Sequence, residues 1–272
     1  MKRAHIFFRY ETDEIAKTVS KIKAWADGRL ELVEDNPDLV VVIGGDGAMM
    51  EAARKFQACG AEILGVNRGT VGFLASIDRK QDIEEALEDV IKGRYTVIER
   101  TLLDATVNRG GEAIFQTVAL NDVVISSPLS VVALNIAIDD KPYLTMRGTG
   151  VLVSTPTGST AYNLSAHGPI LTPSVPALIV TELLDHSVPT PSLIVAEDQK
   201  VTVVVDEFRN HGQLKLSSGE PADVVLDADG SDLFSLQKND QIVITKSEQC
   251  TKFIEFEQYD FFSHLREKFE IS

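Results

Sequence analysis

The stretch that decides the fold is DLVVVIGGDGAMMEAARKF, residues 38–56. It opens with an apolar run between Pro37 and two glycines, the pattern of a strand buried on both faces of a parallel sheet. A helical segment follows the glycines, and Gly60 is placed to end it. Glycines let backbone N–H groups approach a phosphate, and a helix start adds the positive end of a dipole. The stretch therefore predicts an α/β domain with a candidate ligand site at the turn.

The segments around this stretch continue the alternation of strand and helix. We expect a strand at 3–10, a helix from Thr12 or Asp13, a strand at 62–67 and a helix that Gly93 ends. Asp78, with Gln81 three residues later, resembles a capping box for that last helix. This order predicts an α/β domain with a largely parallel sheet over residues 1–100.

After residue 100 the apolar residues alternate with a period of two, which indicates an antiparallel sandwich or a barrel-like β domain. The expected strands are 101–108, 115–126, 132–139, 150–155, 200–208, 213–218, 223–229, 241–247 and 252–259. We assign residues 101–257 to this all-β domain. The tail, 258–272, contains a helical pattern and is expected to dock back on the α/β domain.

Composition excludes several classes of protein. The 44% of hydrophobic residues rules out a disordered chain, and no apolar run reaches the roughly 18 residues of a membrane span. The N-terminus turns acidic before a signal-peptide core can form, and Cys59 and Cys250 fit no metal or redox motif. We therefore expect a cytoplasmic protein with reduced cysteines and no membrane partner.

The charge of the chain restricts its ligands. With 26 basic and 41 acidic residues the formal net charge is -15, which repels nucleic-acid phosphates, so no nucleic-acid partner is expected. A phosphate-bearing small ligand would need backbone N–H groups, a divalent cation or a few placed arginines. The five histidines show no metal-ligand spacing, so we expect no metal site built by the chain itself.

Two glycine-rich turns are the first candidate sites. Gly44, Gly45, Asp46 and Gly47 follow the buried strand, and they match neither a P-loop nor the dinucleotide fingerprint, since Met50 occupies its last glycine position. The alternative for Asp46 is an N-cap in a tight turn. The second turn, 65–73, includes Arg68 and Gly69 and should emerge at the same sheet edge. Arg68 is either a phosphate partner or a solvated side chain.

Two polar segments of the β domain are the other candidates. Asn121 and Asp122 lie inside an apolar strand pattern, where they need polar partners unless a bulge or turn occurs there. Residues 154–160 carry five hydroxyl side chains, and the ring of Tyr162 follows as an aromatic face for a base. Hydroxyls bind neutral groups such as purines without adding charge, so this segment predicts a nucleotide pocket.

These segments together resemble the NAD kinase family. The resemblance rests on GGDG at 44–47, GVNRGTVGFL at 65–74, LND at 120–122, STPTGSTAYNLSAHGPILTP at 154–173 and DADGS at 227–231. It implies an N-terminal α/β domain, a C-terminal β domain, and transfer of the γ-phosphoryl group of ATP to the 2′-hydroxyl of the adenosine ribose of NAD. It also implies a homotetramer or homodimer. Mg²⁺, carried by the triphosphate, would offset the negative charge of the nucleotide.

The resemblance also assigns roles to single residues. Asp46 matches the catalytic aspartate, and Asn121 and Asp122 match the pair that holds the adenosine moiety. Gly44, Gly45, Arg68 and Gly69 remain candidates for the phosphate loop. The other expected binding residues are Gly47, Phe73, Arg147, Thr149, Thr160, Ala161, Tyr162, Asn163, Leu164 and Ser165.

Three positions depart from the family pattern. Thr149 stands where the family usually has an aspartate, Ser231 where it has a glutamine, and 190–192 lack the usual Arg-Pro. Because Thr149 lacks the usual carboxylate, the chain could instead be a regulator that binds a dinucleotide without catalysing a reaction. Another kinase with a GGDG turn, acting on a lipid or a sugar, is the remaining alternative.

Overall fold

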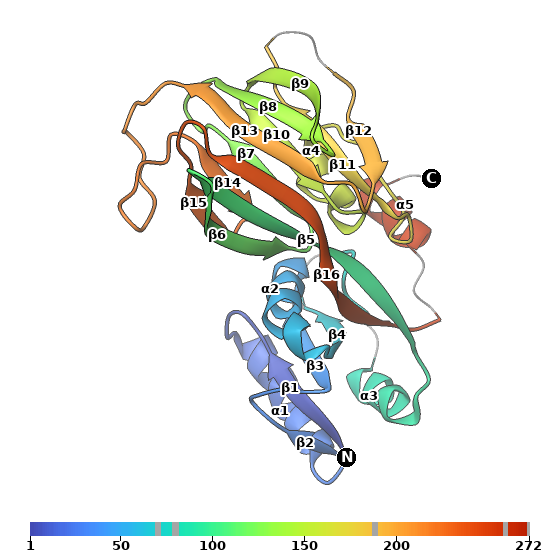
Figure 1. Ribbon diagram of the computed structural model, residues 1–272. Helices are drawn as coiled ribbons and strands as arrows, with labels where there is room; N and C mark the ends of the chain where they lie inside the picture. Colours follow the sequence, from blue (N-terminus) through green and yellow to red (C-terminus); the bar gives the residue numbers. More distant parts are fainter. Residues whose placement is uncertain (69–71, 78–81, 187–189, 258–260, 271–272) are drawn as a thin grey trace. The chain divides into compact units, whose positions relative to one another are not determined.

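The computed structural model describes residues 1–68, 72–77, 82–186, 190–257 and 261–270 (Figure 1). The chain divides into two compact units, Met1–Arg100 with Gln249–Ser272, and Thr101–Glu248. Residues 249–257, assigned from the sequence to the β domain, fall in the first unit of this division. No helix in the described part of the chain is both long and apolar enough to cross a membrane.

The first unit is built on a parallel sheet in the order β2-β1-β3-β4, followed by the end of β16. The strands are β1 (Lys2–Phe7), β2 (Leu30–Leu32), β3 (Leu39–Gly44) and β4 (Glu62–Asn67). β1 pairs with β2 on one side and with β3 on the other, so the order of strands reverses at β1. In α/β sheets, ligands bind beyond the carboxyl ends of the strands at such a reversal. The GGDG turn follows the carboxyl end of β3.

The helices of the first unit begin and end close to the expected positions. They are α1 (Asp13–Ala26), α2 (Asp46–Phe56), the short η1 (Gln57–Cys59), α3 (Ile83–Lys92) and α5 (Phe261–Phe269). The cap of α3 is Asp82, whose carboxylate accepts the Glu84 N–H. Asp78 and Gln81, the expected capping box, lie outside the described residues. In the C-terminal segment the Phe261 ring lies 5.8 Å from the Phe73 ring, within the first unit.

The second unit consists almost entirely of antiparallel strands, and with the parallel sheet of the first unit it confirms the expected fold class. One sheet runs in the order β12-β11-β10-β7-β14-β15. Its strands are β7 (Asp122–Ser126), β10 (Gly150–Ser154), β11 (Ala177–Leu183), β12 (Leu193–Ala196), β14 (Val225–Ala228) and β15 (Asp232–Ser235).

The remaining strands pair in the order β16-β13-β8-β9, with β5 joined to β16 and β6. They are β5 (Thr96–Arg109), β6 (Glu112–Ala119), β8 (Val132–Ile138), β9 (Lys141–Gly148), β13 (Val201–Phe208) and β16 (Gln241–Glu255). Buried side chains of both sets, such as Leu134, Val153 and Val203, share one apolar core. This core fixes the strand ends from which the polar segments emerge.

Several strand predictions are wrong in detail. Residues 115–126 form two strands with a break at Leu120 and Asn121, because carbonyl and N–H groups there bond to other segments. Residues 213–218 form no strand, since the chain turns back and the Gly219 N–H bonds to the Leu216 carbonyl. Conversely, β16 is one strand where two were expected. The strands β2, β9, β11, β12 and β15 were missed.

Candidate functional site

The GGDG turn joins β3 directly to α2. Gly45 is the N-cap residue of α2, and no side chain caps the helix, so the interpretation of Asp46 as an N-cap is wrong. A Cβ on Gly44 would lie 2.8 Å from the Ala48 Cβ, which explains why a glycine precedes this sharp entry into the helix. Asp46 is half-buried and Gly47 is exposed. The Asp46 carboxylate is therefore free to bind groups outside its own helix.

The Asp46 carboxylate ties the two glycine-rich turns together. Its oxygens accept the backbone N–H of Phe73 at 3.0 Å and that of Leu74 at 3.3 Å. A Cβ on Gly72 would lie 2.1 Å from Asp46 Oδ1, so only glycine fits at this position. In addition, the Arg68 N–H donates to the Gly44 carbonyl. The structure thus brings together two segments that the sequence could only place at the same sheet edge.

The Arg68 side chain is partly buried rather than solvated. Its Nε lies 3.3 Å from Thr18 Oγ1 and its Nη1 lies 3.1 Å from the Asn67 carbonyl. These contacts hold the guanidinium against α1 and against its own strand. Gly69, the neighbouring candidate for the phosphate loop, lies outside the described residues.

Arg9 is a cation at the same sheet edge that the sequence did not single out. It follows β1, whose carboxyl end is paired with that of β3. Its Nη1 lies 3.5 Å from the place of a Cβ on Gly47, and its side chain is 48% exposed. Its Nε forms an ion pair with Glu51 at 3.4 Å. Arg9 becomes a candidate phosphate contact only when β1 is known to pair with β3, and the sequence does not reveal that pairing.

In the second unit, Asn121 and Asp122 lie at the break between β6 and β7. Asp122 is opposite Ser154 in the pairing of β7 with β10, so the LND and hydroxyl-rich segments meet. Asp122 is only 6% exposed. Burial, followed by the charges of Asp229 and Asp227, raises the pKa of the Asp122 carboxyl to about 7. At neutral pH this group therefore exists in both its protonated and its ionised form.

The hydroxyls of the segment after β10 mostly bond within the second unit. Thr155 Oγ1 donates to the Leu120 carbonyl at 2.6 Å, and Ser159 Oγ donates to the Pro156 carbonyl at 2.6 Å. Ser154 Oγ lies 3.2 Å from the Asn121 carbonyl. These three residues are fully buried. Their hydroxyls shape the loop, which differs from the expectation that they meet a ligand.

The short elements that follow carry the other expected binding residues. Thr160 ends η2 (Thr157–Thr160), and α4 (Tyr162–Ser165) begins after Ala161. Tyr162 is 46% exposed, Ser165 is exposed, and Thr160, Ala161 and Leu164 are half-buried.

Asn163 differs from its neighbours because it is fully buried. Its amide nitrogen donates to the carbonyls of Ser159 and Pro169, and its oxygen accepts the Thr181 hydroxyl. A Cβ on Gly168 would lie 2.0 Å from that oxygen. This is the arrangement of a residue that shapes the loop.

Arg147 lies near the end of β9, and Thr149 is the residue that joins β9 to β10. The Thr149 N–H donates to the Leu183 carbonyl at 2.9 Å, and the Thr149 carbonyl accepts the Ser127 N–H. The Arg147 side chain is exposed and pairs with Glu207 at 3.5 Å. Burial and the neighbouring Asp185 raise the pKa of Glu182, on the adjacent strand β11, to about 7.

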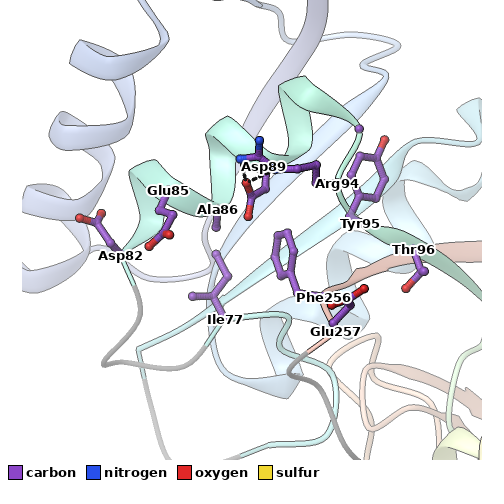
Figure 2. A pocket seen from close by; sticks show the side chains of 11 residues that line it. Ile77, Asp82, Glu85, Ala86, Asp89, Arg94, Tyr95, Thr96, Phe256 and Glu257 are labelled. Atoms are coloured by element: carbon purple, nitrogen blue, oxygen red, sulfur yellow. Dashed lines mark hydrogen bonds and ion pairs between the residues drawn. The ribbon is translucent and has the colours of Figure 1, made fainter.

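A separate hollow of about 930 Å³ lies beside α3 in the first unit, and Figure 2 shows the side chains around it. Carboxylates dominate its polar lining, and one of them, Asp89, is paired with Arg94. The lining residues are Ile77, Asp82, Glu85, Ala86, Asp89, Gly93, Arg94, Tyr95, Thr96, Phe256 and Glu257. None of the expected site residues lines this hollow, and its acidic rim does not suit a phosphate.

Metal-ligand clusters are absent from the described residues, where no group of three or more His, Cys, Asp or Glu side chains could hold an ion. The chemistry that the described segments do offer is a carboxylate beside backbone N–H groups and an arginine in one unit. The other unit offers a buried acid beside a loop with an exposed aromatic ring.

Comparisons with known proteins connect these features to a family. The family model of the ATP-NAD kinase N-terminal domain matches residues 1–95, and the family model of the ATP-NAD kinase C-terminal domain matches residues 120–256. An NAD kinase of Lachnospira eligens is 35% identical over 94% of this chain and 87% of its own length. An NAD kinase of Teredinibacter turnerae is 36% identical over 85% of this chain and 75% of its own.

Two solved structures share the fold. Yeast NADH kinase, complexed with NADH, superposes with a TM-score of 0.87 at 20% identity over 100% of this chain and 88% of its own. An NAD kinase from Archaeoglobus fulgidus, in complex with ATP, has a TM-score of 0.77 at 21% identity over 98% of both chains. With both domain matches in order along one chain and relatives above 30% identity, the protein belongs to the ATP-NAD kinase family.

Proposed function

We propose that this protein transfers the γ-phosphoryl group of ATP to the 2′-hydroxyl of the adenosine ribose of NAD, giving NADP. The observation that carries the proposal is the Asp46 carboxylate, held by the N–H groups of Phe73 and Leu74 at the carboxyl edge of the parallel sheet. Membership of the family supports the choice of ATP and NAD as substrates.

Asp46 is the proposed catalytic residue. Phosphoryl transfer depends on positioning and on stabilisation of charge more than on covalent chemistry. A carboxylate within hydrogen-bond reach of the ribose hydroxyl orients it and accepts its proton as the oxygen attacks. The two backbone donors fix the carboxylate, so the direction of its remaining lone pairs is set before the substrate binds.

The phosphates of ATP are proposed to bind at the carboxyl ends of β1 and β3. Gly44, Gly45 and Gly47 allow backbone N–H groups to approach, and Arg9 adds a positive charge beside Gly47. The described residues provide no carboxylate cage for a metal. We therefore propose that Mg²⁺ arrives with the triphosphate, which requires few ligands from the protein.

The dinucleotide is proposed to bind to the second unit through its adenosine half. Asn121 and Asp122 supply an amide and a carboxyl group for ribose and base. When protonated, Asp122 can donate a hydrogen bond as well as accept one. The exposed Tyr162 ring offers an aromatic face, and Thr160, Ala161, Leu164 and Ser165 line the same loop.

The test is NADP formation from NAD with ATP and Mg²⁺, repeated with NADH and with polyphosphate as donor. A labelled-ATP reaction with a diacylglycerol as acceptor controls for a different alcohol. We expect transfer to the dinucleotide alone. Binding of NAD with no product from any donor would instead support the non-catalytic regulator that Thr149 suggests.

We further propose that the enzyme works in the cytoplasm as a homodimer or homotetramer. The resemblance to the NAD kinase family supports this assembly. Light scattering coupled to size-exclusion chromatography measures it directly, and a monomeric mass at assay concentration would contradict it.

A further inference from the structure

We propose that Asp229 is a positioning residue whose carboxylate fixes the Leu120–Asp122 turn, and with it the directions of the Asn121 and Asp122 side chains. The inference rests on the proposed function, because those two side chains are the proposed adenosine contacts. Asp229 itself is more than a hundred residues away in the chain, in the turn between β14 and β15.

Three hydrogen bonds carry the proposal. Asp229 Oδ2 accepts the Leu120 N–H at 2.8 Å, while Oδ1 accepts the Asn121 N–H at 2.8 Å and the Asp122 N–H at 3.2 Å. The Asp229 N–H in turn donates to the Asp122 carbonyl at 3.1 Å. One side chain thus satisfies three consecutive backbone donors, and hydrogen bonds to a charged acceptor are stronger than neutral ones.

The carbonyl side of the same turn is held from another segment. Thr155 Oγ1 donates to the Leu120 carbonyl, and the Thr155 N–H donates to the Asn121 carbonyl at 2.9 Å. A Cβ on Gly158 would lie 2.1 Å from the Asn121 carbonyl oxygen, so the two segments are in close contact. With both its donors and its acceptors engaged, the turn has little freedom to rotate. The Cα–Cβ bonds of Asn121 and Asp122 are fixed as a consequence.

A simpler role for Asp229 is that of a hairpin residue. Its φ is 55° and that of Gly230 is 69°, and Asp-Gly is favoured in turns that require such left-handed angles. That role needs the backbone conformation but not the carboxylate. Asparagine and glycine tolerate the same φ, so substitution by either separates the two roles.

The experiment compares Asp229→Asn and Asp229→Gly with the wild-type enzyme. Asparagine keeps the size and the φ but has one acceptor oxygen, and glycine keeps the φ with no acceptor at all. We expect KM for NAD to rise on the order of tenfold in Asp229→Gly. It should rise in Asp229→Asn as well, because both carboxylate oxygens accept backbone N–H groups and the amide NH2 would face one of these donors. KM for ATP should stay unchanged, and kcat should change less than KM for NAD.

Asp139→Gly is the matched control. Asp139 also has a left-handed φ, of 50°, in a hairpin turn, and its carboxylate accepts the Lys200 N–H at 2.9 Å. Asp139 is exposed, so the control should destabilise the protein less than Asp229→Gly does, and it should leave KM for NAD unchanged.

The outcomes separate the positioning role from the proposed function. A wild-type KM for NAD in both Asp229 variants would overturn the positioning role, even if both were less stable. Absence of NADP formation by the wild type would reject the proposed function instead. In that event direct titration of NAD against the three variants still tests Asp229, and equal affinities would overturn its role.

Discussion

Asp122→Asn tests the electrostatics of the proposed dinucleotide site through stability alone. The carboxyl of Asp122 is buried, and burial together with Asp229 and Asp227 raises its pKa from 3.8 to about 7. Between these two values the folded protein keeps a proton that the unfolded chain has released. The free energy of unfolding of the wild type therefore falls as pH rises through this range and is level above it.

The magnitude follows from the two pKa values. Each pH unit between them corresponds to about 1.4 kcal/mol, so the whole interval is worth about 4 kcal/mol. Between pH 5.5 and the folded-state pKa, about 2 kcal/mol of this is lost. Asparagine has nearly the same shape and does not titrate. The stability of Asp122→Asn relative to the wild type should thus rise by about 2 kcal/mol from pH 5.5 to pH 8.5.

The measurement is urea denaturation at pH 5.5, 7.0 and 8.5, followed by far-ultraviolet circular dichroism. Fluorescence of Trp25, the single tryptophan, would report on the first unit only. Glu182, whose pKa is also raised, is present in both proteins and cancels in the difference. Asp139→Asn is the control, because bonds from Gln199 and the Lys200 N–H lower the pKa of Asp139 and it does not titrate in this range. Parallel pH curves for the wild type and Asp122→Asn would refute the reasoning.

Three further substitutions test the first unit. Asp46→Asn should bind the dinucleotide normally but lose about 10²–10⁴ in kcat, because an amide cannot accept the hydroxyl proton; near-normal turnover would remove Asp46 from its role. Gly72→Ala places a methyl 2.1 Å from the Asp46 carboxylate, so kcat should fall markedly; an unchanged kcat would mean that the loop moves without consequence. Arg9→Ala should raise KM for ATP several-fold and leave KM for NAD unchanged, as judged by initial rates. The exposed Arg29→Ala serves as its control, and equal effects of the two would rule out a specific phosphate contact.

The fold class could be predicted because the hydrophobic pattern changes period near residue 100. The apolar run before Gly44 is buried at every position of β3 from Leu39 to Ile43, as its lack of polar residues indicated. The strand predictions are wrong where hydrogen bonds to distant segments, rather than the hydrophobic pattern, determine where a strand ends. The 115–126 run breaks because other segments bond to the turn at Leu120 and Asn121. The adjacent polar residues Asn121 and Asp122 were the sign of it in the sequence, and the alternative of a turn at this point is the one that the structure shows.

The candidate residues could be found from the sequence, but the relations between them could not. Glycines and acids in the two turns of the first unit are visible in the chain, whereas the contact of Gly72 with Asp46 depends on the register of β3 with β4. Arg9 remained hidden because its importance depends on which strand lies beside β1. In the same way, the hydroxyl-rich segment was visible, but the use of its hydroxyls to hold the backbone was not.

In both units a carboxylate binds backbone N–H groups of a distant segment, and this explains why the sequence does not reveal which residues are in contact. Asp46 binds the N–H groups of Phe73 and Leu74, and Asp229 binds those of Leu120 to Asp122. In each case the partner of the carboxylate is backbone, which is the same for every residue except proline, so no side chain marks the contact. The structure shows the space that such a contact requires, since a Cβ on Gly72 would lie 2.1 Å from Asp46 Oδ1. Gly72 has no positive φ, so its backbone conformation does not require a glycine. The contact between the Asp46 carboxylate and the backbone is therefore the reason that only glycine fits there.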